Sequence, residues 1–310
     1  ATLSEAPYER EELTLLVDVG TNAEIVLGNS KRMVAASSPT GPAFEGAQIS
    51  GGQRAAPGAI ERVRIDPGTL EPRFRIIGSE LWSDEPGFAE ACAETGITGI
   101  CGSGIIEVIA EMYLAGIIKT DGVIDGSLAG RSDRIVPDEK TWSYRLHDEG
   151  QVNITITQND VRAIQLAKAA LYAGARLLMD KLNVDSVDRI RLAGAFGAHI
   201  DVKYAMVLGM IPDCELEHVT SAGNAAGTGA TITLLDTDAR CEIEDVVKRI
   251  QKVETAVEAK FQDHFVEALA IPHKSAGFEH LSREVNLPQP AEATAEENGG
   301  GRQRRRRRRG

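Results

Sequence analysis

Residues 13–27 read Leu13-Thr-Leu-Leu-Val-Asp18-Val-Gly20-Thr21-Asn22-Ala-Glu24-Ile-Val-Leu27. The two runs rich in Val, Ile and Leu are typical of strands, and the Gly-Thr-Asn between them is typical of a turn. The pattern therefore predicts a β-hairpin with the Asp18 carboxylate beside its turn. Short motifs of this kind also occur in hairpins that bind nothing, so an ordinary hairpin is the alternative interpretation.

The turn carries the residue types of a phosphate site. A glycine at position 20 lets a ligand come close to bare backbone, and successive N–H groups in such a turn form an anion-binding concavity. A carboxylate beside bound phosphate holds Mg²⁺ directly or through water. We therefore predict that Asp18 binds Mg²⁺ and orients the attacking water. The backbone N–H groups of Gly20, Thr21 and Asn22, together with the Thr21 hydroxyl, are predicted to hold phosphate oxygens.

Composition and charge limit the class of protein. The 310 residues are 42% hydrophobic and 26% charged, as in an ordinary globular protein with a sizeable core. No apolar run reaches the roughly 18 residues of a spanning helix, and the first residues lack the basic start and apolar stretch expected of a signal peptide. The formal net charge is −12 although Arg302 and Arg304 to Arg309 are positive, so the body is acidic. We therefore expect a cytoplasmic protein without a membrane or nucleic-acid partner.

The sequence predicts one large α/β lobe with two flanking segments. Residues 1–12 form a charged lead-in, and residues 13–285 form the lobe, with a small excursion of turns and short strands at 121–150. Residues 286–310 form an Arg-rich tail whose Pro, Glu, Ala and Gly cannot build a core, which predicts disorder. Near the end of the lobe, Glu242–Glu258 has the charge and apolar spacing of an amphipathic helix.

The cysteines give no sign of a metal or cluster site. No two of them have C-x-x-C spacing, and none has histidines at ligand spacing, so we expect reduced, mostly structural thiols. The four cysteines are Cys92, Cys101, Cys214 and Cys241.

Three further glycine-rich turns follow apolar strands or open helices. The Gly99–Gly104 turn either cradles a phosphate or lets its helix pack closely on a sheet. The strand Arg189–Ala193 runs into a second turn, Gly194–His199, and then into a helix, an order that places ligands at the carboxyl end of a sheet. The third turn, Ser221–Gly229, opens a helix of small residues.

Three polar side chains have alternative interpretations. Glu45, in a Gly- and Pro-rich loop, either positions a metal or water or is simply an exposed loop carboxylate. Lys168 follows a Thr157–Asp160 capping box on a long predicted helix, and we expect it to face solvent rather than a cleft. His199 is the best-placed histidine for catalysis, although a structural role is the expected one.

An ordered set of motifs resembles the C-terminal part of the reductive activators of corrinoid proteins. These activators belong to the acetate and sugar kinase, Hsc70 and actin superfamily. The set spans most of the chain, from about residue 13 to 285, and its order makes the resemblance specific. Its members are Asp18–Glu24, the Gly-Pro-Ala-Phe-Glu-Gly-Ala segment at 41–47, Gly99–Gly104, Gln158–Arg162, Leu192–Gly197 and Gly223–Ala226.

The resemblance implies an RNase H-like, actin-like α/β fold, with a mixed sheet flanked by helices and ATP bound in a cleft between two lobes. It implies that Asp18 to Asn22 form the second phosphate motif of that superfamily. It further implies that Gly194, Ala195 and Gly197 line the adenosine pocket, and that Gly223 and Asn224 lie near the hinge.

The resemblance also implies a function and its partners. Family members use ATP to reduce a Co(II) corrinoid protein of a methyltransferase system to Co(I), with the electron coming from an N-terminal [2Fe-2S] domain. This sequence lacks the ferredoxin cysteines and a first Asp-Gly hairpin, so we expect a C-terminal fragment of a longer protein that carries the cluster elsewhere. A homodimer is a further expectation.

Two other functions are compatible with the residues. A small-molecule kinase of the same superfamily requires a catalytic base in addition to Asp18, and the sequence offers no clear candidate. A non-catalytic interaction domain uses its glycine turns only for packing, and it predicts no stabilisation by nucleotide.

Overall fold

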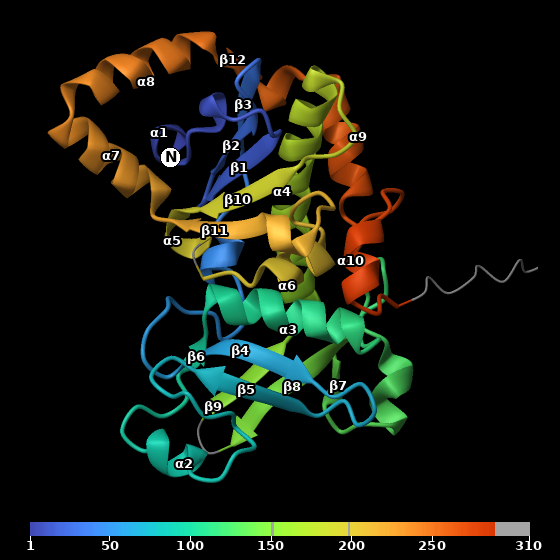
Figure 1. Cartoon of the computed structure of the whole chain (residues 1–310). Coiled ribbons are helices and arrows are strands. Elements are labelled where there is room, and N and C mark those ends of the chain that lie inside the picture. Colours follow the sequence, from blue (N-terminus) through green and yellow to red (C-terminus); the bar gives the residue numbers. More distant parts are fainter. Residues whose placement is uncertain (150–151, 198, 289–310) are drawn as a thin grey trace, which may run out of the picture.

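The computed structural model describes residues 1–149, 152–197 and 199–288 (Figure 1). Within these residues the larger sheet has six strands in the order β11-β10-β1-β2-β3-β12. β1 pairs antiparallel with β2 and parallel with β10, so the sheet is mixed. Its strands are β1 Thr14–Val19, β2 Ala23–Gly28, β3 Met33–Ser38, β10 Arg189–Ala193, β11 Val219–Gly223 and β12 Gln251–Lys252.

The predicted hairpin forms as β1 and β2. Val19 pairs with Ala23 across the turn, and alternate β1 residues face opposite sides of the sheet. Leu15 and Val17 are fully buried in the main core, whereas Leu16 faces the other side, in a smaller cluster with Ala193 and Ala225. Asp18 shares the face of Leu16, because one strand residue separates them.

Helix α4 (Gln158–Leu182) covers the main-core face of the sheet. It begins with the predicted capping box, in which the Thr157 hydroxyl accepts from the Asp160 N–H and the Asp160 carboxylate accepts from the Thr157 N–H. A Cβ at Gly174 would lie 2.7 Å from Ile25 Cδ1, so this helix lies unusually close to the hairpin.

A second lobe lies between β3 and α4 in the sequence and forms the lower half of the molecule in Figure 1. Within the described residues it has two three-stranded sheets, ordered β5-β4-β6 and β7-β8-β9. Helix α3 (Gly102–Leu114) lies against β4 and also contacts α6 (Val202–Leu208) of the upper lobe. The strands are β4 Ala59–Ile65, β5 Pro72–Ile76, β6 Gly99–Ile100, β7 Ile135–Asp138, β8 Thr141–Glu149 and β9 Val152–Ile156.

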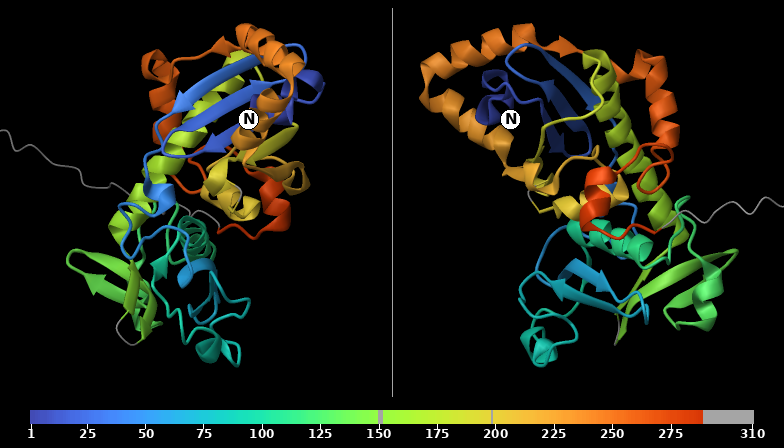
Figure 2. Two further views of the ribbon diagram at one scale, coloured as in Figure 1. Left: turned by 90° about the vertical axis from the view of Figure 1, so that its left-hand side faces the viewer. Right: turned by 45° about the vertical axis from the view of Figure 1, so that its right-hand side comes forward.

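Figure 2 shows the two lobes from further sides, with α7 and α8 forming an arch beside the N-terminal segment. No helix among the described residues is long and apolar enough to cross a membrane. The remaining α-helices are α1 Thr2–Glu5, α2 Phe88–Ala91, α5 Gly194–Gly197, α7 Ala225–Leu235, α8 Thr237–Arg249, α9 Ala259–Glu267 and α10 Glu279–Glu284. The 3₁₀ turns are Pro7–Glu9, Ala43–Glu45, Gly126–Gly130, Leu216–His218 and Thr255–Val257.

The helix predicted over Glu242–Glu258 is wrong at both ends. Helix α8 begins earlier because the Asp236 carboxylate accepts the N–H groups of Asp238 and Ala239. It ends at Arg249, where the chain becomes extended and β12 pairs in parallel with β3. Sheet pairing therefore overrides the helical periodicity of the sequence in this segment.

The order of the strands defines the fold. Three antiparallel strands, β1 to β3, are followed through α4 by β10 and β11, which add in parallel on the other side of β1. This is the arrangement of the RNase H-like fold, and helices flank both faces of the mixed sheet (Figure 1). The predicted fold class is therefore confirmed.

Candidate nucleotide site

The carboxyl ends of β1, β10 and β11 meet at one edge of the larger sheet. The three strands are parallel, with Asp18 of β1 beside Ala193 of β10, and Ala193 beside Gly223 of β11. The chain leaves these strands through the Gly20–Asn22 turn, through Gly194, and through Asn224. Segments that are far apart in the sequence thus converge where ligands of open α/β sheets commonly bind.

Gly194 lies directly over the Asp18 carboxylate. Its φ is +94°, and a Cβ there would lie 2.6 Å from Asp18 Oδ1 and 2.8 Å from the Val19 carbonyl oxygen. Both the backbone conformation and the space therefore require glycine. Asp18 itself is partly exposed.

The Gly20–Asn22 turn is held from behind by the loop that follows β3. The Thr40 hydroxyl shares its single proton between the carbonyl oxygens of Gly20 (2.7 Å) and Thr21 (3.0 Å), and the Gly41 N–H also donates to the Thr21 carbonyl (2.9 Å). These bonds occupy the carbonyls, whereas the described loop backbone offers no acceptor to the N–H groups of Gly20, Thr21 and Asn22. The turn can therefore present N–H donors to an anion.

Glu45 lies at the same turn. The Thr21 hydroxyl donates to Glu45 Oε1 at 2.9 Å, and Glu45 ends the 3₁₀ turn Ala43–Glu45, in which Phe44 is buried. The sequence left open whether Glu45 has a positioning role or is an exposed loop carboxylate. The structure places this exposed carboxylate against one of the predicted phosphate-binding residues.

Gly223 and Asn224 lie at the end of β11, where α7 begins. Gly223 has φ of +59°, and a Cβ there would meet no atom within 4 Å, so space is open beside it. The Asn224 side chain accepts from the Gly227 N–H at 2.9 Å and caps α7. Its side chain is therefore engaged in starting the helix, whose N-terminus carries a partial positive charge at this edge.

The Gly99–Gly104 turn serves close packing. A Cβ at Gly104 would lie 2.4 Å from the Ile60 carbonyl oxygen, and the Cys101 N–H donates to that same oxygen at 3.0 Å. The glycine thus lets α3 lie against β4, and the packing alternative holds for this turn. Cys92, Cys101 and Cys214 are buried and Cys241 is exposed, all as free thiols.

The prediction that Lys168 faces solvent is wrong. Its side chain is 1% exposed, and the ammonium donates to the carbonyl oxygens of Ala270 and Pro272. Burial lowers its pKa well below the ordinary lysine value. Lys168 therefore links the segment after α9 to α4. His199, which the sequence offered as a candidate catalytic histidine, is exposed.

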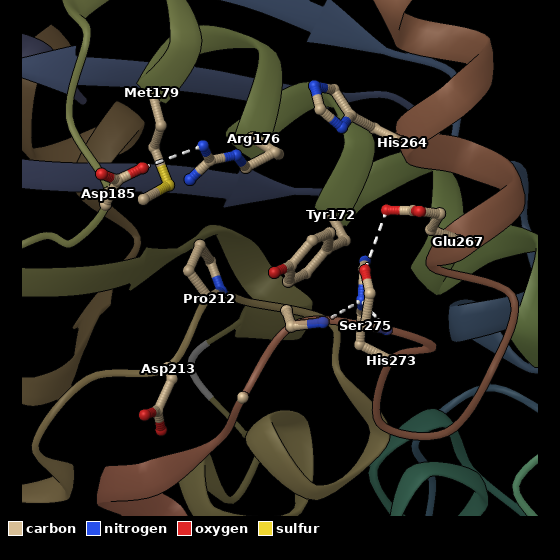
Figure 3. Close-up of a pocket in the computed structure, with 12 residues that line it drawn as sticks. Tyr172, Arg176, Met179, Asp185, Pro212, Asp213, His264, Glu267, His273 and Ser275 are labelled. Carbon is tan, nitrogen blue, oxygen red and sulfur yellow. Dashed lines mark hydrogen bonds and ion pairs between the residues drawn. The ribbon is translucent and has the colours of Figure 1, made fainter.

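A separate pocket of ≈ 460 Å³ lies between α4, α9 and the segment 273–277 (Figure 3). His273 in this pocket accepts the N–H groups of Ser275 and Ala276 on Nδ1, and burial, with Lys168 adding to it, lowers its pKa to about 4. The pocket includes none of the predicted site residues. Sequence reasoning missed it because its walls come from segments far apart in the chain.

Asp18 is a carboxylate that the described residues place at the carboxyl edge of the larger sheet. Among them, no group of three or more His, Cys, Asp or Glu residues could hold a metal ion. Mg²⁺ usually takes one or two carboxylates and completes its shell with water and substrate phosphates. Asp18 can supply such a carboxylate beside a turn that can hold phosphate.

The RNase H-like sheet and its glycine turns define a domain of the acetate and sugar kinase, Hsc70 and actin class. The family model described as the C-terminal domain of RACo, the ASKHA domain, matches residues 12–282. The chain therefore belongs to this family.

Relatives of known name agree with this assignment. The chain is 36% identical over 269 residues to the corrinoid activation enzyme RamQ of Eubacterium limosum, covering 83% of this chain and 42% of the relative. It is 27% identical over 252 residues to a Co(II) methylated amine-specific corrinoid protein reductase of Methanosarcina barkeri, covering 78% and 42%.

A solved structure is similar as well. The reductive activator for corrinoid, iron-sulfur protein superimposes with a TM-score of 0.77 at 33% identity, over 92% of this chain and 43% of that one. The chain thus spans about two fifths of the length of the relatives it matches.

Proposed function

We propose that this chain is the nucleotide-binding domain of an ATP-dependent activator that reduces Co(II) corrinoid proteins to Co(I) for methyl transfer. One observation carries the nucleotide part of the proposal: Asp18, the Gly20–Asn22 turn and Gly194 meet at the carboxyl edge of the sheet. The names of the relatives support the corrinoid part, because each of them acts on a corrinoid protein.

Different residues at the sheet edge bind different parts of the nucleotide in this proposal. N–H groups of Gly20, Thr21 and Asn22 hold phosphate oxygens, and the backbone of Gly194, Ala195 and Gly197 lines the adenosine. Gly223 and the start of α7 close the side of the site. Asp18 holds Mg²⁺, which when bound neutralises charge on the phosphates, and Asp18 orients the water for hydrolysis.

Nucleotide acts in this proposal as a conformational input. The loop after β10 leads through α5 directly to α6, and α6 contacts α3 of the second lobe. A ligand that binds one arrangement of the lobes better than another shifts the population toward it. The favoured arrangement docks the cytoplasmic corrinoid partner, and one electron from a [2Fe-2S] domain outside this sequence then converts Co(II) to Co(I). We also propose that the protein forms a homodimer.

Thermal unfolding with and without MgATP tests the nucleotide part. A ligand at 100 times its dissociation constant adds about 2.7 kcal/mol to the free energy of unfolding, so the melting temperature should rise by several degrees. Asp18→Asn should remove the rise, while Asp133→Asn, at an exposed site of the second lobe, should retain it. No rise in the unaltered chain would instead favour the interaction-domain alternative.

A further inference from the structure

The loop that carries Glu45 is fixed on both sides. Besides the Thr40 and Gly41 bonds to the turn, Phe44 is 1% exposed in the core. Gly46 follows with φ of +86°, and a Cβ there would lie 2.8 Å from the Gln53 carbonyl oxygen. Glu45 therefore projects from an anchored segment, and its contact with Thr21 is a feature of the fold.

This contact decides what the Thr21 oxygen can offer a ligand. A hydroxyl has one proton and two lone pairs, whereas a carboxylate only accepts hydrogen bonds. The 2.9 Å bond to Glu45 commits the Thr21 proton to the carboxylate, and such charge-assisted bonds are about twice as strong as neutral ones. Thr21 can then accept from water or bind a cation, but it cannot donate to a phosphate oxygen.

The negative charges around the turn, like the Thr21–Glu45 bond, disfavour direct contact with a free phosphate group. Asp18 and Glu45 both lie beside it, and among the described residues no lysine, arginine or histidine forms an ion pair with either one. A free triphosphate that approaches this turn is repelled by both carboxylates. A nucleotide already complexed with a divalent cation is repelled less, because the cation offsets part of the phosphate charge and is itself attracted to the carboxylates.

From these observations we infer that Glu45 is a specificity-determining positioning residue. It orients the Thr21 hydroxyl and, with its own charge, makes the turn select metal-complexed nucleotide over free nucleotide. This inference rests on the proposed nucleotide site, and it replaces phosphate donation by the Thr21 hydroxyl with an accepting role.

The test compares ATP affinity in the presence of Mg²⁺ with ATP affinity in EDTA, measured by titration calorimetry. In the unaltered chain, Mg²⁺ should increase the affinity strongly. Glu45→Gln removes the charge and lets the side-chain amide donate to Thr21, which frees the hydroxyl proton for phosphate. The ratio of the two dissociation constants should therefore fall about tenfold, which corresponds to about 1.4 kcal/mol.

Three matched variants separate this role from a merely structural one. Glu45→Asp retains the carboxylate and should restore the ratio, and Thr21→Val should lower it by removing the oxygen. Glu90→Gln, at an exposed carboxylate on α2 of the second lobe, should leave it unchanged.

Two results overturn the inference in distinguishable ways. If Glu45→Gln weakens ATP binding equally with and without Mg²⁺, Glu45 only supports the loop, and the nucleotide site itself stands. If the unaltered chain binds ATP under neither condition, the proposed function fails as well.

Discussion

Two pairs of carboxylates in this molecule differ in how many hydrogen-bond and ion-pair partners they have. Glu107, on α3 between the lobes, is 1% exposed and accepts from Arg62 Nη1 (2.7 Å), Arg64 Nη1 (2.6 Å) and the Val63 N–H (2.9 Å). Glu111, one turn later, accepts from the Ile65 N–H at 3.0 Å and from the Tyr204 hydroxyl of α6.

The second pair lies at the carboxyl edge of the larger sheet. Glu45 accepts one hydrogen bond, from Thr21, and neither Glu45 nor Asp18 forms an ion pair with a basic side chain of the described residues. Saturated carboxylates at the junction hold α3 along an edge of β4 and against the upper lobe. The carboxylates at the sheet edge have oxygen lone pairs without partners among the described residues, and these lone pairs remain available to a ligand. The comparison thus separates charge that serves the fold from charge that serves binding.

The largest expected effect is on stability. Glu107→Ala leaves two arginines and a backbone N–H without their acceptor, and loss of one partner of a buried pair costs about 3 kcal/mol. The arginines are about a third exposed, which places the effect at the low end of the usual range. Urea unfolding of this variant measures the loss.

MgATP affinity of folded Glu107→Ala should change far less than that of Asp18→Asn, because Glu107 lies on α3 and its oxygens are taken by Arg62, Arg64 and the Val63 N–H. Asp18→Asn should show the opposite behaviour, with stability retained and nucleotide binding lost. Equal effects of both variants on both properties would remove the distinction between the two pairs.

A somewhat smaller free-energy change is expected for Gly194→Ala, and it should fall on binding. The new Cβ meets Asp18 and Val19 at a backbone conformation that favours glycine, so the loop must move away from the carboxylate. Displacements of about 1 Å in a preorganised site cost roughly 100-fold, and we expect a loss of this size in MgATP affinity. Gly130→Ala is the control, because a Cβ there meets no atom within 4 Å. Unchanged affinity in Gly194→Ala would contradict the placement of nucleotide at this edge.

The sequence predicted those features that depend on neighbouring residues. The hairpin at 13–27 and the capping box at Thr157–Asp160 are local patterns, and both are confirmed. The strand–turn–helix order at 189–199 predicted a site at the carboxyl end of a sheet, and the structure places the end of that strand beside Asp18. The roles of Asp18 and the turn residues in binding stay predictions.

Features that depend on distant contacts were not predictable. Lys168 is buried because the segment around Pro272 folds back onto α4, and no local pattern indicates this. The Thr21–Glu45 bond likewise required the structure. Glu107 and Glu111 carried a signal that could have been used: two glutamates four residues apart interrupt an otherwise apolar helix, and a buried carboxylate must find partners.

Hydrogen–deuterium exchange with MgATP tests the central claim most directly, because it reports where nucleotide binds. We expect slower exchange in peptides that contain Gly20–Asn22 and Gly194–Gly197, and no change in the pocket segment 264–277. Asp18→Asn should abolish this protection. Protection confined to the pocket segment, or none at either turn when MgATP is saturating, would contradict the account.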